Sequence, residues 1–173
     1  PDDGTLGRET YQEKTAHIRK VQPAYEAHTE GRKAIQEGNV GLAEQKARDA
    51  LRIEPREAKF HGLLGQVNAE RQQYDAALND FNKAIELNPE YFEFYVFRGL
   101  IQQERRNLQA ARQDLQKANQ LLPTAIAHEA LGDISLAQGQ RGQAIEHYRI
   151  AASSNSPVGQ RAAEKLRRMG YAG

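Results

Sequence analysis

The stretch AKFHGLLGQVNAERQQYDAALNDFNKAIELNPE, residues 58–90, decides the fold. Its apolar residues recur every three or four positions, as on one face of an α-helix, and they show no strand-like alternation. The polar run RQQYD, residues 71–75, divides the stretch into two helical segments. Pro89 ends the second segment, because proline lacks the backbone N–H that the next helical turn needs. Residues 58–90 therefore predict a pair of α-helices.

The same pair recurs along the chain at intervals of 34, 34 and 33 residues. Small residues and prolines keep these intervals: Gly31, Gly65, Gly99 and Gly132; Ala43, Ala77, Ala111 and Ala144; Ala50, Ala84, Ala118 and Ala151; and Pro55, Pro89 and Pro123, with Pro157 one residue late. Glycine inside a helix costs about 1 kcal/mol relative to alanine, so its regular return indicates that two helices approach closely there. We expect first helices at about 24–37, 58–71, 92–105 and 125–138, and second helices at about 41–53, 75–87, 109–121 and 142–154.

This pattern resembles the tetratricopeptide repeat, whose signature is a large residue, Leu-Gly, Tyr, Ala, an aromatic residue, Ala and Pro. Residues 58–90 match it at Leu64, Gly65, Ala77, Phe81, Ala84 and Pro89. The other units depart from it, with Ala27, His61, Tyr95 and His128 in the large-residue slot and Glu30 and Arg98 in two of the leucine slots. The two units with charged residues in the leucine slot are expected to pack less regularly. The resemblance implies an all-α, right-handed solenoid of four helix pairs, at residues 24–57, 58–91, 92–124 and 125–157.

Both ends of the chain carry a further helical pattern. Residues 158–173 place Val158, Ala162, Leu166 and Met169 at helical spacing. This pattern predicts a C-terminal capping helix, which a solenoid needs to cover its last hydrophobic face. Residues 1–23 carry a sparse stripe of Tyr11, Ile18 and Val21 ahead of Pro23. This stripe predicts a lead-in helix. We expect it to arrive from an upstream domain, because the chain begins at Pro1 rather than at a methionine.

Composition argues against several classes of function. The 173 residues include 24 Lys and Arg against 23 Asp and Glu, so the net charge of +1 favours neither nucleic acid nor an anionic membrane. The absence of cysteine removes disulfides, thiolate nucleophiles and cysteine-based zinc sites. No segment approaches the roughly 18 apolar residues that a membrane helix needs. We therefore expect no nucleic-acid partner and no direct membrane insertion.

The residues that could perform chemistry are scattered. His61 and His128 occupy the packing slot of their units, and the other three histidines fall on different helices without carboxylates at metal-ligand spacing: His17, His28 and His147. No HExxH, GxSxG, P-loop or GxGxxG motif is present. The basic residues near the C-terminus are predicted to form the solvated face of the capping helix: Arg161, Lys165, Arg167 and Arg168. We expect no catalysis, no metal and no cofactor in this chain.

By the resemblance, the binding site lies in a concave groove lined by the first helices. In NPEYFEFYVFRGL, residues 88–100, Phe94 and Tyr95 fall in core slots, whereas Val96, Phe97 and Leu100 fall in groove slots. The predicted peptide-binding groove consists of Leu63, Gln66, Glu93, Val96, Phe97, Leu100, Ile126, Ala130 and Asp133. Some members of the family hold a peptide's terminal carboxylate with a clamp, whose slots here hold His28, Arg32, Leu63, Glu93 and Phe97. Because that clamp is not kept, we expect the partner to offer an apolar peptide or helix.

A second resemblance concerns residues 121–171 and the lead-in stretch at residues 8–35. Both are similar to the repeat region that follows the protease domain in bacterial cell-envelope zinc metallopeptidases of the HExxH type. It implies a periplasmic or cell-envelope location, with a cytoplasmic location as the alternative, and an upstream catalytic domain. Three functions stay open: a protein-binding module, an accessory region that docks on a protease domain of the same polypeptide, and a self-assembling scaffold. The predicted capping helix weakens the third.

Overall fold

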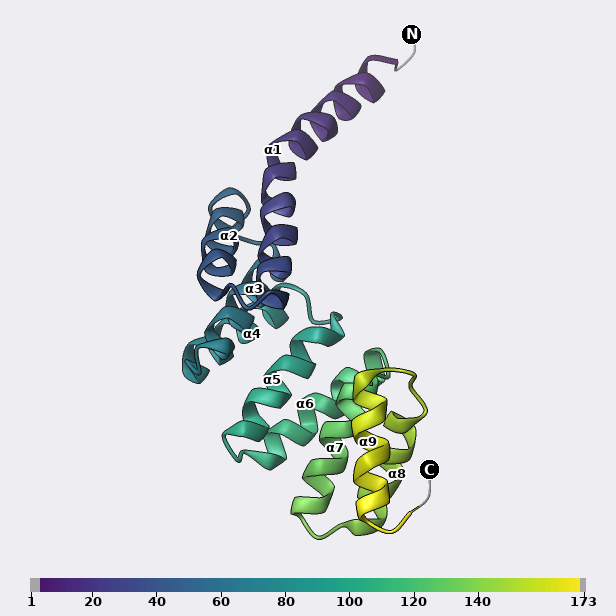
Figure 1. The fold of residues 1–173 in the computed structure, drawn as a ribbon. Helices are drawn as coiled ribbons and strands as arrows, with labels where there is room; N and C mark the ends of the chain where they lie inside the picture. The colour runs from purple at the N-terminus through teal and green to yellow at the C-terminus, as the bar shows by residue number, and fades with distance from the viewer. Residues whose placement is uncertain (1–3, 172–173) are drawn as a thin grey trace. The chain divides into compact units, whose positions relative to one another are not determined.

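In the computed structural model, residues 4–171 are described, with side chains from residue 10 onward. These residues form nine α-helices and no strand, so the predicted all-α fold is confirmed (Figure 1). The helices are α1 (Gly4–Gln36), α2 (Val40–Ile53), α3 (Ala58–Glu70), α4 (Tyr74–Leu87), α5 (Phe92–Glu104), α6 (Leu108–Leu121), α7 (Ala125–Ala137), α8 (Arg141–Ala152) and α9 (Pro157–Arg168). Apart from the start of α1, the repeat helices begin and end within two residues of the predicted positions.

The helices pack in sequential pairs within two compact units, residues 1–87 and 88–173. In the first unit α1 packs on α2 and α3 on α4, and α3 also contacts both α1 and α2. In the second unit α5 packs on α6 and α7 on α8, and α7 also contacts α5 and α6. Helix α9 lies against α7 and α8. We call α1, α3, α5 and α7 the first helices, and α2, α4, α6 and α8 the second helices.

The predicted lead-in helix is present, but the boundary placed at Pro23 between this helix and the first repeat helix is wrong. Helix α1 runs without interruption from Gly4 to Gln36, with Pro23 inside it. Pro23 removes one backbone N–H, which breaks a single hydrogen bond but leaves the turns on both sides intact, and such a proline usually kinks the helix. Figure 1 shows α1 changing direction partway along its length. The lead-in segment and the first repeat helix are therefore one bent helix.

The repeated glycines lie where a large side chain crosses between helices. A β-carbon built on Gly65 would stand 2.9 Å from the ring of Phe81, and one on Gly132 would stand 2.5 Å from the ring of Tyr148. Gly99 meets Leu115 in the same way. In the first pair the corresponding second-helix residue is the small Ala47, and Leu63 from α3 approaches Gly31 instead. The predicted close approach of the two helices is thus present in every pair.

All four turns between paired helices use one hydrogen-bonding pattern. In the second pair, Gln72 N–H donates to the carbonyl of Ala69 and Gln73 N–H donates to that of Asn68, both at 2.9 Å. This is the Schellman ending of a helix, which needs one residue with a positive φ. The positive-φ residues in these four turns are Gly38, Gln72, Arg106 and Gly139, spaced like the repeats themselves. Two of the four turns therefore hold a side chain where glycine would be unstrained.

The capping helix α9 closes the second unit as the sequence predicts. Ser156 caps its start by accepting a hydrogen bond from Gly159 N–H at 3.1 Å, and Pro157 occupies the first turn, where its missing N–H costs nothing. Ala162 and Leu166 are buried against a cluster that includes Tyr148 and Ala151 on α8. The opposite face of α9 is charged, as a terminal cap requires.

Candidate functional site

Three of the nine predicted groove residues are buried. Leu63, Val96 and Ala130 are only 1%, 4% and 4% exposed. Leu63 fills the space left by Gly31, so it belongs to the core of the first unit. Their assignment to an open groove is corrected here: these side chains stabilise the packed helices and present almost no surface to a partner.

The other apolar groove residues keep part of their surface. Phe97 and Leu100 on α5 and Ile126 on α7 are half-buried, as are the polar residues Gln66 on α3 and Glu93 on α5. Glu93, Phe97 and Leu100 follow each other at intervals of four and three residues, which places them on one face of α5. On α7, Ile126 is half-buried and Leu136, nearer the end of the helix, is 44% exposed. Because α5 and α7 are in contact, the second unit presents apolar surface on two neighbouring first helices.

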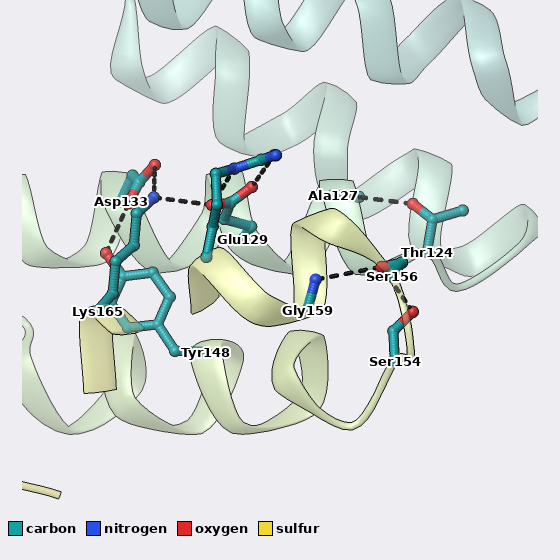
Figure 2. Close-up of polar contacts among 10 residues, drawn as sticks. Thr124, Ala127, Glu129, Asp133, Tyr148, Ser154, Ser156, Gly159 and Lys165 are labelled. Atoms are coloured by element: carbon teal, nitrogen blue, oxygen red, sulfur yellow. Dashed lines mark hydrogen bonds and ion pairs between the residues drawn. The ribbon is translucent and has the colours of Figure 1, made fainter. Parts of the chain in front are cut away.

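Asp133, also predicted to line the groove, is bonded to the cap. Lys165 on α9 donates to both of its carboxylate oxygens, at 2.7 and 2.8 Å, and Tyr148 donates its hydroxyl at 2.6 Å (Figure 2). One turn earlier on α7, Glu129 accepts from Arg161 at 2.8 Å and pairs with Lys165 at 3.1 Å. Asp133 therefore joins α7, α8 and α9 and is committed to structure.

The basic residues of α9 are neutralised by specific carboxylates. Arg161 and Lys165 pair with Glu129 and Asp133, while Arg167 and Arg168 both pair with Glu164 on the same helix. Burial alone would raise the pKa of Glu129, but hydrogen bonds from Arg161 and Lys165 outweigh burial and hold that pKa below its ordinary value. The face of α9 is therefore an ordered set of ion pairs rather than a bare basic patch.

A row of polar pairs joins the two helices of every repeat, and the sequence analysis missed it. On the second helices the row consists of Lys46, Asp80, Asp114 and His147, at the repeat intervals of 34, 34 and 33 residues. Their partners on the first helices are Glu30, Asn68, Arg98 and His128, respectively. The signal was present, because Glu30 and Arg98 stand in leucine slots. A charged residue in the leucine slot pairs with a residue of opposite charge on the second helix, so these units are not packed irregularly.

The fourth pair of this row differs in kind. The Nδ1 atoms of His128 and His147 lie 3.1 Å apart. From the sequence, the two residues were expected on different helices, and no contact between them was predicted. In the second and third repeats the residue in the slot of His128 bonds to the carbonyl of a proline six positions earlier: His61 to Pro55 at 2.8 Å and Tyr95 to Pro89 at 3.0 Å. His128 turns instead to the neighbouring helix.

At the start of the repeats, His28 is packed rather than poised for chemistry. Its ring lies 5.4 Å from that of Phe60, between centroids. Burial lowers the pKa of His28, and the positive charges of Arg32 and Lys59 lower it further. Nearby, Tyr25 donates its hydroxyl to Glu57 at 2.6 Å, which raises the pKa of Tyr25 to about 12. These side chains bind α1 to α3.

Among the described residues, no three His, Cys, Asp or Glu side chains gather as metal ligands would. Within residues 4–171, no helix combines the length and the apolar character needed to cross a bilayer.

Two family models match the repeats. A model described as "TPR repeat" matches residues 65–105, and one described as "Tetratricopeptide repeat" matches residues 28–80. No curated protein matches the chain.

Solved structures with the same fold are numerous. A thermophilic TPR protein from Thermus thermophilus shares 19% identity at a TM-score of 0.74, over 94% of this chain and 96% of that one. Pseudomonas aeruginosa pilF shares 25% identity at a TM-score of 0.76, over 86% of this chain and 69% of its own. The first TPR of Spaghetti (RPAP3), solved with the HSP90 peptide SRMEEVD, shares 23% identity at a TM-score of 0.64, over 68% of this chain and 94% of its own. The Thermus thermophilus protein and RPAP3 are below 25% identity, so their similarity to this chain shows a shared fold only.

Proposed function

Because the chain is a tetratricopeptide repeat protein, we propose that it is a protein-interaction module whose second unit binds an apolar segment of a partner on α5 and α7. The repeat is an interaction fold rather than a catalytic one. The observation that carries the proposal is the apolar surface of Phe97, Leu100 and Leu136 on two adjoining first helices. Apolar patches of this kind are typical of surfaces that bind another protein.

The chemistry of this face favours an apolar ligand over an acidic one. The structural neighbour RPAP3 was solved with a peptide that ends in two glutamates, a valine and an aspartate. In this chain, the slots that the family uses to clamp a terminal carboxylate include the buried Leu63 and the acidic Glu93. Neither side chain is a cation that could pair with a terminal carboxylate. We therefore expect the ligand to lack a required terminal carboxylate.

Peptide selection tests the proposal directly. Random peptides displayed on phage are selected on the whole chain, and the enriched peptide is titrated by fluorescence anisotropy. Burying a Phe side chain is worth roughly 1.5–3 kcal/mol, so Phe97→Ala should weaken binding about tenfold to a hundredfold. Ile150→Ala is the matched control, because Ile150 is 44% exposed on the second helix α8 and should leave binding unchanged.

A third variant separates binding from folding. Tyr95 is 8% exposed and donates its hydroxyl to the carbonyl of Pro89, so Tyr95→Ala should lower the melting temperature by opening a cavity. Selected peptides without apolar residues, or a folded Phe97→Ala variant with unchanged peptide affinity, would place the binding site elsewhere.

A second candidate function has one observation in its favour. Helix α1 presents Tyr11 and Ile18, at 73% and 61% exposure and seven residues apart, on a segment that packs against little else. We propose as the alternative that α1 docks on a catalytic domain of the same polypeptide, as the resemblance to cell-envelope zinc metallopeptidases implies, with a periplasmic location. The sequence of the gene upstream of Pro1 tests this, since an HExxH motif behind a signal peptide is required.

A further inference from the structure

We propose that His128 and His147 form a two-imidazole binding site for a divalent transition metal ion of the Zn²⁺ and Ni²⁺ class, which joins α7 to α8. No function or partner assigned above depends on this site. It rests on the position of the two rings, and on the contrast between His147 and the residues that hold its position on the second helices of the other repeats, which are Lys46, Asp80 and Asp114.

The separation of the two nitrogens matches the spacing of two ligands on one ion. Zinc–imidazole bonds of 2.0–2.1 Å, meeting at angles between 90° and the tetrahedral value, place two ligand nitrogens about 2.8–3.4 Å apart. The Nδ1 atoms of His128 and His147 lie 3.1 Å apart, within that range. The ion would take the place of the proton that the two rings now share.

The other three cross-helix pairs could not coordinate a metal ion in this way. Glu30 with Lys46 and Arg98 with Asp114 are ion pairs, in which an ammonium or guanidinium already satisfies the carboxylate. Asn68 donates its amide to Asp80 at 2.6 Å. Two neutral imidazoles have no such charge complementarity, yet imidazole nitrogen is the ligand that zinc, nickel and copper share. In the fourth repeat the second-helix position of this row holds an imidazole, and its partner on the first helix is a second imidazole.

The surroundings of the two imidazoles make each ring harder to protonate. Burial lowers the pKa of both imidazoles, and the pKa of His147 is lowered further by His128 and by Arg112 on α6, against a rise caused by Glu146. The other charged groups of the neighbouring helices are engaged, because Glu129 and Asp133 on α7 pair with Arg161 and Lys165 on α9. The lowered pKa values favour the neutral imidazole, which is the form that binds a metal ion.

Binding at neutral pH requires only a change of tautomer. One ring of the pair carries its proton on Nδ1 and donates it to the other. When the metal binds, that proton moves to Nε2 of the same ring, so both Nδ1 atoms are free to coordinate and no net proton is released. Both rings are half-buried rather than enclosed, so water can complete the coordination shell. We expect an affinity below that of a closed four-ligand zinc site.

The test is calorimetric titration of the full chain with ZnCl₂ at pH 7.5, with MgCl₂ as the hard-cation control. We expect one Zn²⁺ per chain, no Mg²⁺ binding, and a higher melting temperature in the presence of Zn²⁺ because the ion binds only the folded pair. His128→Gln and His147→Gln should each weaken binding at least about tenfold, which corresponds to losing one of two ligands. His61→Gln is the matched control, because His61 bonds to Pro55 in the first unit.

A second measurement needs no variant. Nitrogen NMR of the imidazoles in the wild-type chain should show Zn²⁺ shifting the Nδ1 resonances of two histidines, and binding should weaken as the pH falls from 7.5 to 5.5 because protons compete. Absence of saturable binding, an unchanged affinity in either single variant, or coordination through Nε2 alone would each overturn the site.

Discussion

Arg98 on α5 donates two hydrogen bonds to the carboxylate of Asp114 on α6, at 2.8 and 2.7 Å. Arg98 occupies the position at which two other repeats have a leucine on the first helix. Its partner Asp114 is only 8% exposed. A paired, little-exposed carboxylate depends on its cation, because removing one partner leaves the other desolvated and uncompensated. The charged residue in the leucine slot is thus a structural requirement of its repeat.

Arg98→Leu should therefore destabilise the chain although leucine fits the repeat pattern. We expect a loss of about 2–4 kcal/mol, since Asp114 keeps its charge and loses its cation. The double variant Arg98→Leu with Asp114→Ala should recover much of that loss, because no unpaired charge remains. Urea unfolding followed by circular dichroism measures both. A double variant less stable than Arg98→Leu would contradict this account.

Gly132→Ala should destabilise the second unit. Its β-carbon would stand 2.5 Å from Tyr148, whose ring is fixed in the core and bonded to Asp133. Overpacking of this kind costs about 1–3 kcal/mol. Gly142→Ala is the control, because Gly142 lies in α8 with nothing within 4 Å and an ordinary φ, so alanine there should be neutral or slightly stabilising. Thermal melts of the two variants should shift in opposite directions or differ clearly in size.

Gln72→Gly and Arg106→Gly should stabilise the chain. Both residues have a positive φ, at 60° and 63°, in the same turn where the other two repeats have glycine. A left-handed conformation costs a residue with a side chain about 1–2 kcal/mol, although the greater freedom of glycine in the unfolded chain offsets part of the gain. Gly38→Ala, at a φ of 74°, should do the reverse. Equal melting temperatures for all three variants would show that these turns carry no strain.

The cap should loosen in acid. The pKa of Glu129 is held below its ordinary value of 4.5 in the folded chain, so its ion pairs stabilise the chain above about that pH. This stability is lost as the pH falls through the depressed value, because protonation removes the charge that binds Arg161 and Lys165. Melting temperatures recorded from pH 6 down to pH 3 should fall less steeply for Glu129→Gln than for the wild type. Parallel curves would assign the acid sensitivity to other carboxylates.

The sequence by itself determined the helix pairs, their boundaries and the places of closest approach. A helix places every third or fourth residue on one face, so the spacing of apolar residues reports which face is buried. Glycine returning at a fixed interval reports where no side chain fits. Gly65 and Gly132 lie at such places, and the structure adds that Phe81 and Tyr148 are the side chains against them. The cap was equally local, since Ala162 and Leu166 mark its buried face before any neighbour is known.

The tertiary structure decided which side chains meet across helices and which remain exposed. Spacing places Leu63 and Phe97 in equivalent slots, but Leu63 fills the hollow at Gly31 whereas Phe97 keeps part of its surface. Asp133 was predicted to line the groove, but it is bonded to the capping helix because α9 places Lys165 against it. His128 contacts His147 because α8 packs beside α7. Pro23 stayed within a helix because one missing hydrogen bond costs less than ending α1 there. These outcomes depend on distances between segments far apart in the chain, which a repeat interval does not encode.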